Sequence, residues 1–246
     1  MYRFILLNII SISILSSKET DLPEVIDFGK LRLVDCYYHK PGTTWSERLG
    51  RAAYNAGITA FNDAPELEAL FIMLADDYKI DTVIETGTYF TATTRFFSLH
   101  FNDVHTVDIQ ESLYTQAKAL FYEDPNVHCY LGSSEKILHE ILPSLKDKRV
   151  LFYLDAHWND FWPLLDELEE ISKTHRDNCI IAIDDFKVPG RNDIEFDQYG
   201  THECSYAYIK SKLEKVFTQY SIHYIIPKNT YNRAKLLALP REITIH

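Results

Sequence analysis

The sequence is poor in cysteine, and its four cysteines stand far apart, at Cys36, Cys129, Cys179 and Cys204. None of them belongs to a C-x-x-C pair, which excludes a zinc ribbon and a dithiol redox site. Reduced, buried thiols fit this usage, as in proteins of a reducing compartment.

Basic residues are also in the minority, with 25 lysines and arginines against 36 aspartates and glutamates. The formal net charge of −11 opposes binding to nucleic-acid phosphates and to anionic lipid. No local cluster of basic residues overrides this charge. We therefore expect no nucleic-acid partner, and the sequence leaves formation of a homo-oligomer open.

Long apolar runs are absent as well. The apolar run at residues 4–15 is interrupted by polar side chains and falls far short of the ~20 residues that a spanning helix needs. We expect no transmembrane span. Because Arg3 precedes the run, a cleaved secretory signal over residues 1–17 stays open, although residues 16–19 hold no clear small-x-small cleavage site. The alternative is an N-terminal strand or helix that packs on the domain.

The 246 residues contain no repeat, no low-complexity tract and no linker, so they are typical of one large domain with an extension. We place the N-terminal extension at residues 1–63, with a loop and a helix at 47–56, and the domain at residues 64–246. A helix over 64–78 is predicted because its apolar residues recur at i, i+3, i+4 and i+7.

From residue 81 onward, short apolar runs alternate with amphipathic segments. The expected strands are 82–85, 104–108, 127–131, 150–155, 180–184, 222–226 and 235–239. The expected helices between them are 93–99, 111–122, 134–142, 161–173 and 206–217. This alternation predicts an α/β fold of the doubly wound, Rossmann-like class, with a mostly parallel seven-stranded sheet. The last two strands are close in sequence and predict an antiparallel C-terminal hairpin at or near one edge.

The first strand of the sheet ends in Glu85 and turns through Gly87 into a helix that begins near Thr93. Glycine lets the backbone approach a ligand closely, and the helix directs unpaired N–H groups at the crevice. A carboxylate that closes an apolar strand is costly to bury alone, so we expect Glu85 to meet a cation or hydrogen-bond donors. An ordinary strand-to-helix turn with a solvated glutamate is the alternative.

The next two strands end in residues that suit a nucleoside. Asp108 follows the glycine turn by about 20 positions, where one carboxylate can accept hydrogen bonds from both hydroxyls of an adenosine ribose. Gly132 and Ser133 follow the third strand and are expected to line an adenine pocket. Helix capping is the alternative for Asp108.

Two further strands end in acidic residues, Asp155 on one and Asp184 with Asp185 on the other. Carboxylates that gather at one rim repel one another, and a hard cation such as Mg²⁺ relieves that repulsion. His157 lies two positions beyond Asp155 and has the near-neutral pKa of a general base. Turn chemistry at the acids and aromatic packing at His157 are the alternatives.

The segment at 186–203 contains Pro189, Gly190 and two aromatic residues, and it has neither a helical nor a strand period. A polar, aromatic loop of this length beside the strand ends is typical of a lid or a substrate wall.

With these residues the sequence resembles class I S-adenosylmethionine (SAM)-dependent methyltransferases, and among them the metal-dependent small-molecule O-methyltransferases of the macrocin and catechol type. The resemblance spans about residues 64–239. Its nucleotide loop matches Glu85-Thr86-Gly87-Thr88-Tyr89 and Thr93, and its ribose-binding acid matches Asp108.

The resemblance also implies a reaction. Asp155, Asp184 and Asp185 would bind Mg²⁺, His157 and Asp155 would be catalytic, and Asp155 would also contact the cofactor SAM. The substrate would be a small hydroxylated molecule, aligned for direct methyl transfer and deprotonated. Because the methyl donor is a cytosolic metabolite, we expect a cytoplasmic protein, or a secreted or periplasmic one if residues 1–17 are removed.

One position departs from the family pattern, because Thr91 stands where the loop usually carries a second glycine. A side chain there would crowd the methionine part of SAM, which leaves a catalytically silent binding protein as the main alternative. A nicotinamide-dependent oxidoreductase ranks lower, since the loop lacks the G-x-G-x-x-G pattern.

Overall fold

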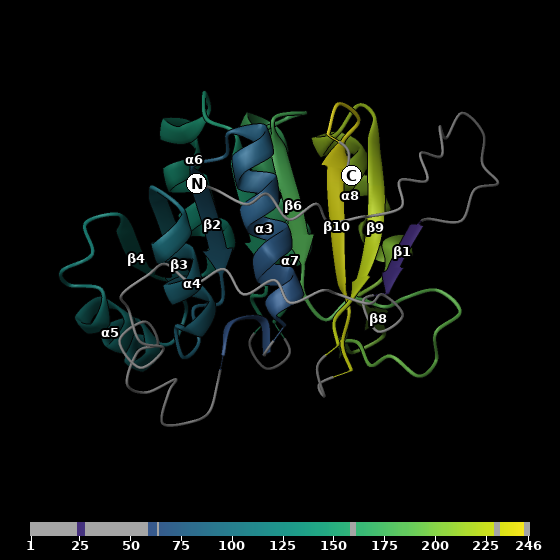
Figure 1. The fold of residues 1–246 in the computed structure, drawn as a ribbon, viewed down its shortest axis with the longest axis horizontal. Coiled ribbons are helices and arrows are strands. Elements are labelled where there is room, and N and C mark those ends of the chain that lie inside the picture. Colours follow the sequence, from purple (N-terminus) through teal and green to yellow (C-terminus); the bar gives the residue numbers. More distant parts are fainter. Residues whose placement is uncertain (1–23, 28–58, 63, 158–160, 229–231, 244–246) are drawn as a thin grey trace, which may run out of the picture.

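Eight strands of the described residues form one mixed sheet with helices on both faces (Figure 1). The computed structural model describes residues 24–27 in backbone only, and residues 59–62, 64–157, 161–228 and 232–243. The strands of the sheet are β1 (Glu24–Asp27), β2 (Thr82–Thr86), β3 (Asp103–Asp108), β4 (Val127–Leu131), β5 (Val150–Leu154), β6 (Cys179–Ile183), β9 (Tyr220–Ile226) and β10 (Lys235–Pro240). The helices are α3 (Pro65–Tyr78), α4 (Ala92–His100), α5 (Glu111–Leu120), α6 (Ser134–Leu145), α7 (Leu164–Thr174) and α8 (Tyr206–Val216), with a 3-10 turn, η1 (Ala60–Asn62).

The predicted fold class is confirmed. Each of the seven predicted strands is present, with bounds that differ by at most two residues. The central strands β2, β5, β6 and β10 are buried along their whole length because both sheet faces are covered. β9 and β10 form the predicted antiparallel hairpin.

One strand of this sheet, β1, was not predicted, because it holds only four residues and lies within the expected N-terminal extension. β1 pairs in parallel with β9 and so extends the sheet beyond the hairpin. The expected helix at 47–56 and the residues of the expected signal segment lie outside the described residues.

No helix among the described residues is long and apolar enough to cross a membrane.

The order of the strands, β1-β9-β10-β6-β5-β2-β3-β4, places a topological switch point between β2 and β5. The chain runs outward from β2 to β4 and then returns to the other side of β2 with β5. In such sheets the connections that follow the two strands run to opposite sides at the switch point and leave a crevice for a ligand at the carboxyl ends. β10 is antiparallel to β6, so its first residues lie at this same rim of the sheet.

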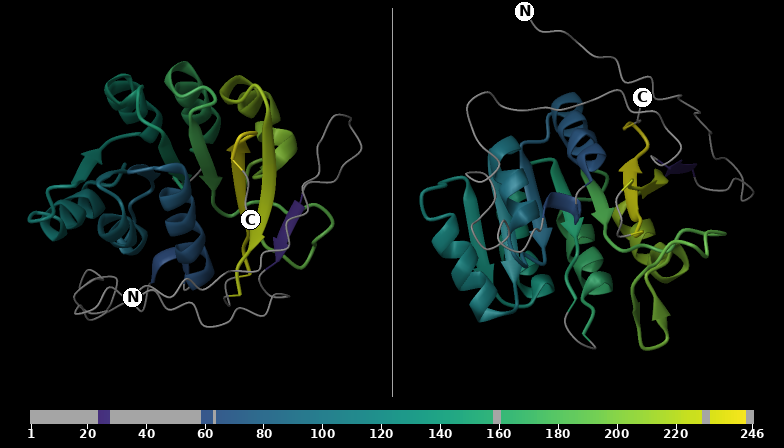
Figure 2. Two further views of the ribbon diagram at one scale, coloured as in Figure 1. Left: turned by 45° about the horizontal axis from the view of Figure 1, so that its top comes forward. Right: turned by 60° about the horizontal axis from the view of Figure 1, so that its bottom comes forward.

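Two apolar cores cover the two faces of the sheet. On one face lie α3 and α4 (Figure 1). They pack through side chains such as Leu67, Phe71 and Phe97. On the other face, α6, α7 and α8 pack through leucines such as Leu138 and Leu168. Figure 2 shows the sheet enclosed between these layers. Because both faces are packed, the strand ends at the switch point are held in fixed positions.

The loop after β6 holds a short hairpin of β7 (Gln198–Tyr199) and β8 (His202–Glu203) before α8 begins. Tyr199 packs its ring against His157 and Trp162. The predicted aromatic loop therefore lies beside the end of β5.

Candidate functional site

A cavity of about 510 Å³ opens at the carboxyl ends of β2, β3, β4, β5 and β6, at the switch point of the sheet. Most of the residues expected from the sequence line it: Gly87, Tyr89, Asp108, Gly132, Ser133, Asp155, His157, Asp184 and Asp185. Its volume is in the range that proteins use for small ligands and cofactors. The structure thus brings together groups from five strands that are distant in the chain.

Gly87 is the residue that allows the loop after β2 to approach β5. Its φ is +89°, and a Cβ added there would lie 2.7 Å from the carbonyl oxygen of Asp155. Its N–H donates to the carbonyl of Val107 at the end of β3. Any side chain at this position would push the loop away from β5, so the cavity floor depends on glycine.

Glu85, Thr88 and Thr93, also expected at the cofactor, are not among the residues that line the cavity. Glu85 is buried and accepts hydrogen bonds from the hydroxyls of Thr94 and Thr106. Burial raises the pKa of Glu85 to about 7, although these two hydrogen bonds lower it. The expectation that Glu85 meets donors is confirmed, and the donors come from α4 and β3.

The other two residues also join neighbouring elements. The hydroxyl of Thr88 lies 2.6 Å from that of Thr106, and the Thr93 hydroxyl accepts a hydrogen bond from the backbone of Phe61. Thr88 and Thr93 therefore stabilise the loop after β2 from the side that does not line the cavity.

Asp108 presents its carboxylate at the cavity in a fixed orientation. Its Oδ2 accepts a hydrogen bond from the backbone N–H of Tyr89 and its Oδ1 from that of Gln110, at 3.0 and 2.8 Å. Burial raises the pKa of Asp108, although these two hydrogen bonds lower it. Each carboxylate oxygen can still accept a second hydrogen bond, which is what a pair of ribose hydroxyls requires.

Asp184 lies at the far end of the cavity and is paired with a buried lysine. Its Oδ1 lies 2.6 Å from Nζ of Lys235, the first residue of β10, and its Oδ2 accepts a hydrogen bond from Tyr153. Burial would raise the pKa of Asp184, but the Lys235 ammonium and these hydrogen bonds hold it below its usual value. Lys235 is 1% exposed, and the attraction of Asp184 outweighs burial and raises its pKa.

Asp155 and Asp185 carry negative charge that is only partly balanced. Burial and the neighbouring Asp184 raise the pKa of Asp185 to about 7, against the opposing effect of Lys235 and Arg233. Burial and the other two aspartates raise the pKa of Asp155 well above its usual value. Oδ2 of Asp185 is paired with Arg233 at 2.8 Å, whereas its Oδ1 is buried without a hydrogen bond to any described residue.

His157 lies at the mouth of the cavity and is about half exposed. Its Nε2 is 3.9 Å from Asp197, and its ring packs against Tyr199. Asp197 also binds Arg233, at 2.5 Å. The imidazole is therefore held beside the cavity by the loop after β6.

Sequence reasoning missed the cations of the site, Lys235 and Arg233, together with Asp197 and Tyr153. A lysine at the start of an apolar strand and a tyrosine inside one were signals that could have been used, because such groups need partners when buried. Arg233 and Asp197 carried no such signal, since they lie in polar loops.

The acidic rim has the donor chemistry for a divalent cation. Among the described residues, two buried or half-buried cations pair with the carboxylates of Asp184, Asp185 and Asp197, namely Lys235 and Arg233. One carboxylate oxygen of Asp185 has no hydrogen-bond partner among these residues. Both carboxylate oxygens of Asp184 already have partners, Lys235 and Tyr153. The ligand atoms of the three predicted metal-binding residues, Asp155, Asp184 and Asp185, do not all lie within 4.8 Å of one another.

Thr91, the residue that departs from the family pattern, has φ of +69° at the start of α4. This left-handed conformation is where glycine is favoured and where a β-branched side chain is strained. Thr91 is buried but is not among the described residues that line the cavity. Its side chain therefore strains the loop without entering the cavity.

We expect Thr91→Gly to raise the free energy of unfolding by about 1 kcal/mol, because it removes backbone strain. Binding of SAM should be kept or tightened. Chemical denaturation and calorimetric titration measure the two effects. Thr91→Ala is the matched control, since it removes the same hydroxyl but retains a Cβ at positive φ; an equal gain in the control would show that strain is not the cause.

We expect Lys235→Met to lower the free energy of unfolding by about 3–5 kcal/mol, because it leaves the Asp184 carboxylate buried without its cation. Adding Asp184→Asn to this variant should recover part of the loss. Lys173→Met, at the exposed pair with Glu170, should change stability by less than about 1 kcal/mol. Urea denaturation of the three variants and the unmodified protein measures these differences, and a loss at Lys235 no larger than that at Lys173 would contradict the role of the buried pair.

No family model matches the sequence, and no curated protein matches it. Solved structures do match the fold. An O-methyltransferase from Bacillus cereus in complex with SAH has a TM-score of 0.61 at 14% identity, over 81% of this chain and 92% of that chain. The O-methyltransferase TomG from Streptomyces achromogenes, in complex with SAM, has a TM-score of 0.56 at 14% identity, over 81% and 91%. The chain thus has the Rossmann-like fold of SAM-dependent O-methyltransferases.

Proposed function

We propose that this protein is a SAM-dependent methyltransferase that methylates a hydroxyl group of a small molecule. The observation that carries the proposal is the cavity at the switch point, with Asp108 at one end and the acidic rim of Asp155 and Asp185 at the other. The structural neighbours crystallised with SAM or SAH support the choice of cofactor.

The cofactor end of the cavity has a distinct role for each residue. Asp108 would accept hydrogen bonds from the ribose hydroxyls, because its carboxylate is already oriented by two backbone N–H groups. Gly132 and Ser133 would contact the adenine, and Gly87 would let the loop lie close to the methionine part. SAM would supply an electrophilic methyl group, so the protein needs no nucleophilic residue of its own.

The acceptor end would orient a hydroxyl and remove its proton. His157 and Asp155 both line the cavity, and either can accept a proton from a hydroxyl held between them. Asp197 holds His157 on this side and would stabilise the imidazolium that forms.

Mg²⁺ would be held mainly by Asp155 and Asp185, the carboxylates whose charge is least balanced. Mg²⁺ in proteins commonly takes one or two carboxylates and keeps several waters. Asp184, predicted as a third ligand, already binds Lys235 and Tyr153. It would mainly hold the ends of β5, β6 and β10 in position at the rim. When bound, Mg²⁺ would supply positive charge that lowers the pKa of the acceptor hydroxyl.

We expect Asp108→Asn to weaken SAM binding about 10- to 100-fold, because hydrogen bonds to a charged acceptor contribute roughly 1.5–3 kcal/mol. Calorimetric titration of the full chain with SAM measures this. Asp147→Asn, an exposed substitution that removes the same charge, should leave the affinity unchanged. No binding of SAM to the unmodified protein at millimolar concentration would contradict the proposed function.

We expect the SAM-loaded protein to bind one Mn²⁺, used as a paramagnetic probe for Mg²⁺, at the acidic rim. Asp185→Asn should weaken this binding at least tenfold and leave the affinity for SAM within about twofold. Asp147→Asn again serves as the charge-matched control. Unchanged Mn²⁺ binding in Asp185→Asn would remove the metal from this site while leaving the methyltransferase proposal standing.

A further inference from the structure

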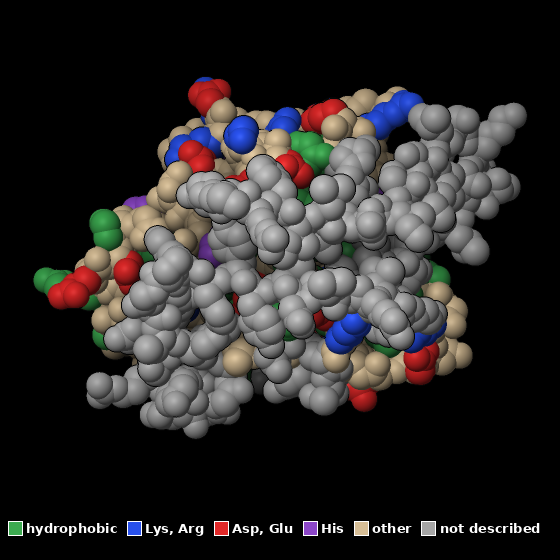
Figure 3. Space-filling model, viewed as in Figure 1, with side chains coloured by type: hydrophobic (Ala, Val, Ile, Leu, Met, Phe, Trp, Pro, Cys, Tyr) green, Lys and Arg blue, Asp and Glu red, His purple; other side chains and the backbone are tan. Residues whose placement is uncertain are grey.

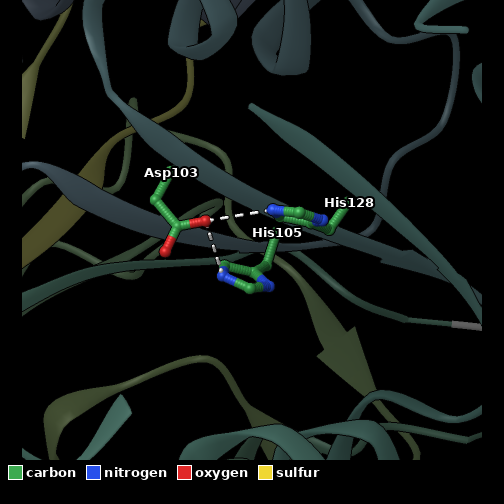
Figure 4. A group of neighbouring side chains, drawn as sticks. All are labelled: Asp103, His105 and His128. Carbon is green, nitrogen blue, oxygen red and sulfur yellow. Dashed lines mark ion pairs between the residues drawn. The ribbon is translucent and has the colours of Figure 1, made fainter. Parts of the chain in front are cut away.

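A second cluster of ligand-type side chains lies on the outer part of the sheet, outside the cavity. Asp103 and His105 belong to β3, and His128 belongs to the neighbouring strand β4, where it pairs with His105 in the strand register. Figure 4 shows the two imidazoles directed at the same carboxylate. Among the described residues, this is the group of three whose ligand atoms lie within 4.8 Å of one another.

The two distances from the carboxylate oxygen to the imidazole nitrogens are those of ligands around one ion. Oδ1 of Asp103 lies 3.1 Å from Nε2 of His105 and 3.2 Å from Nε2 of His128. In a tetrahedral zinc site, bonds of about 2.0 Å place neighbouring ligand atoms about 3.3 Å apart. Both imidazole nitrogens therefore stand where a small shift admits an ion between them and the oxygen.

His105 is held in the orientation that a metal ligand needs. Its Nδ1 lies 2.9 Å from the hydroxyl of Tyr130, which fixes the ring, while its Nε2 is buried and off the direction of a hydrogen bond. A partner on the second ring nitrogen is the usual arrangement for a histidine that binds a metal. The Tyr130 ring also stacks on His105, with an interplanar angle of 12°.

The one other charged group at Asp103 among the described residues, Lys148, leaves Oδ1 of Asp103 available to an ion. Lys148 binds Oδ2 of Asp103 at 2.8 Å, so the ammonium lies on the opposite oxygen from the two histidines. His128 is about half exposed, which provides a path for an ion from solvent.

We propose that Asp103, His105 and His128 bind one Zn²⁺ ion, with the fourth position open to water. Two imidazoles and a carboxylate are a ligand set that suits zinc rather than Mg²⁺, which prefers oxygen ligands. The ion would join β4, the strand at one edge of the sheet, to β3. This site is separate from the proposed methyltransferase site, because none of its three residues lines the cavity.

The test is a calorimetric titration of the metal-stripped full chain with Zn²⁺, together with thermal unfolding with and without the ion. We expect one Zn²⁺ per chain and a melting temperature raised by several degrees, because a ligand that binds only the folded state stabilises it. His128→Ala should weaken Zn²⁺ binding at least tenfold and abolish the rise in melting temperature. His128 is half exposed, so this variant should fold.

Two controls identify the site. His139→Ala removes an exposed histidine that pairs with Glu170 on another part of the surface and should bind Zn²⁺ as the unmodified protein does. Asp185→Asn should also retain Zn²⁺ binding, which separates this site from the acidic rim. Absence of Zn²⁺ binding in the unmodified chain, or equal binding in His128→Ala, would overturn the proposal.

Discussion

The ion pair between Asp184 and Lys235 is the interaction on which the candidate site depends. It joins the end of β6 to the start of β10 in the interior of the protein, where neither charge could remain alone. Tyr153 adds a hydrogen bond from β5 to the same carboxylate. Three strands are thus fixed to one another at the rim, and the positions of Asp155 and Asp185 follow from theirs.

The pair also determines the electrostatics of the cavity. Lys235 faces all three predicted metal-binding aspartates, but its strongest attraction is to Asp184. Arg233 binds Asp185 and Asp197 from the exposed side. The remaining negative charge lies on Asp155 and Asp185, and this imbalance gives the rim its affinity for protons and its suitability for a cation.

On the face shown in Figure 3, acidic and basic side chains of described residues lie mixed along the upper edge.

Much of the fold and part of the site could be predicted from the sequence. The strands were predictable because both faces of the sheet are covered, so most strands are short runs rich in apolar residues. The acids at the strand ends were predictable because parallel strands end at one rim. The pairing of Lys235 with Asp184 was not, because sequence alone does not show that β10 lies between β6 and β9. β1 is too short to give a pattern.

Glu85 and Thr91 also differ from the sequence prediction. Glu85 was expected to contact the cofactor, and the Thr91 side chain was expected to crowd its methionine part. Both lie in the segment that matches the family loop, yet neither reaches the cavity; one is bound by threonine hydroxyls behind the loop, and the other strains its backbone. A motif indicates which loop approaches the ligand, whereas side-chain direction depends on the packing of α4 against β3.

The central claim is that SAM binds in the cavity with its reactive end toward the acidic rim. The most direct measurement is a crystal structure of the full chain soaked with SAM. We predict that the ribose hydroxyls bind Asp108 and that the sulfonium methyl group lies on the side of Asp155 and His157. SAM bound elsewhere, or a cavity without SAM at millimolar concentration, would contradict this account.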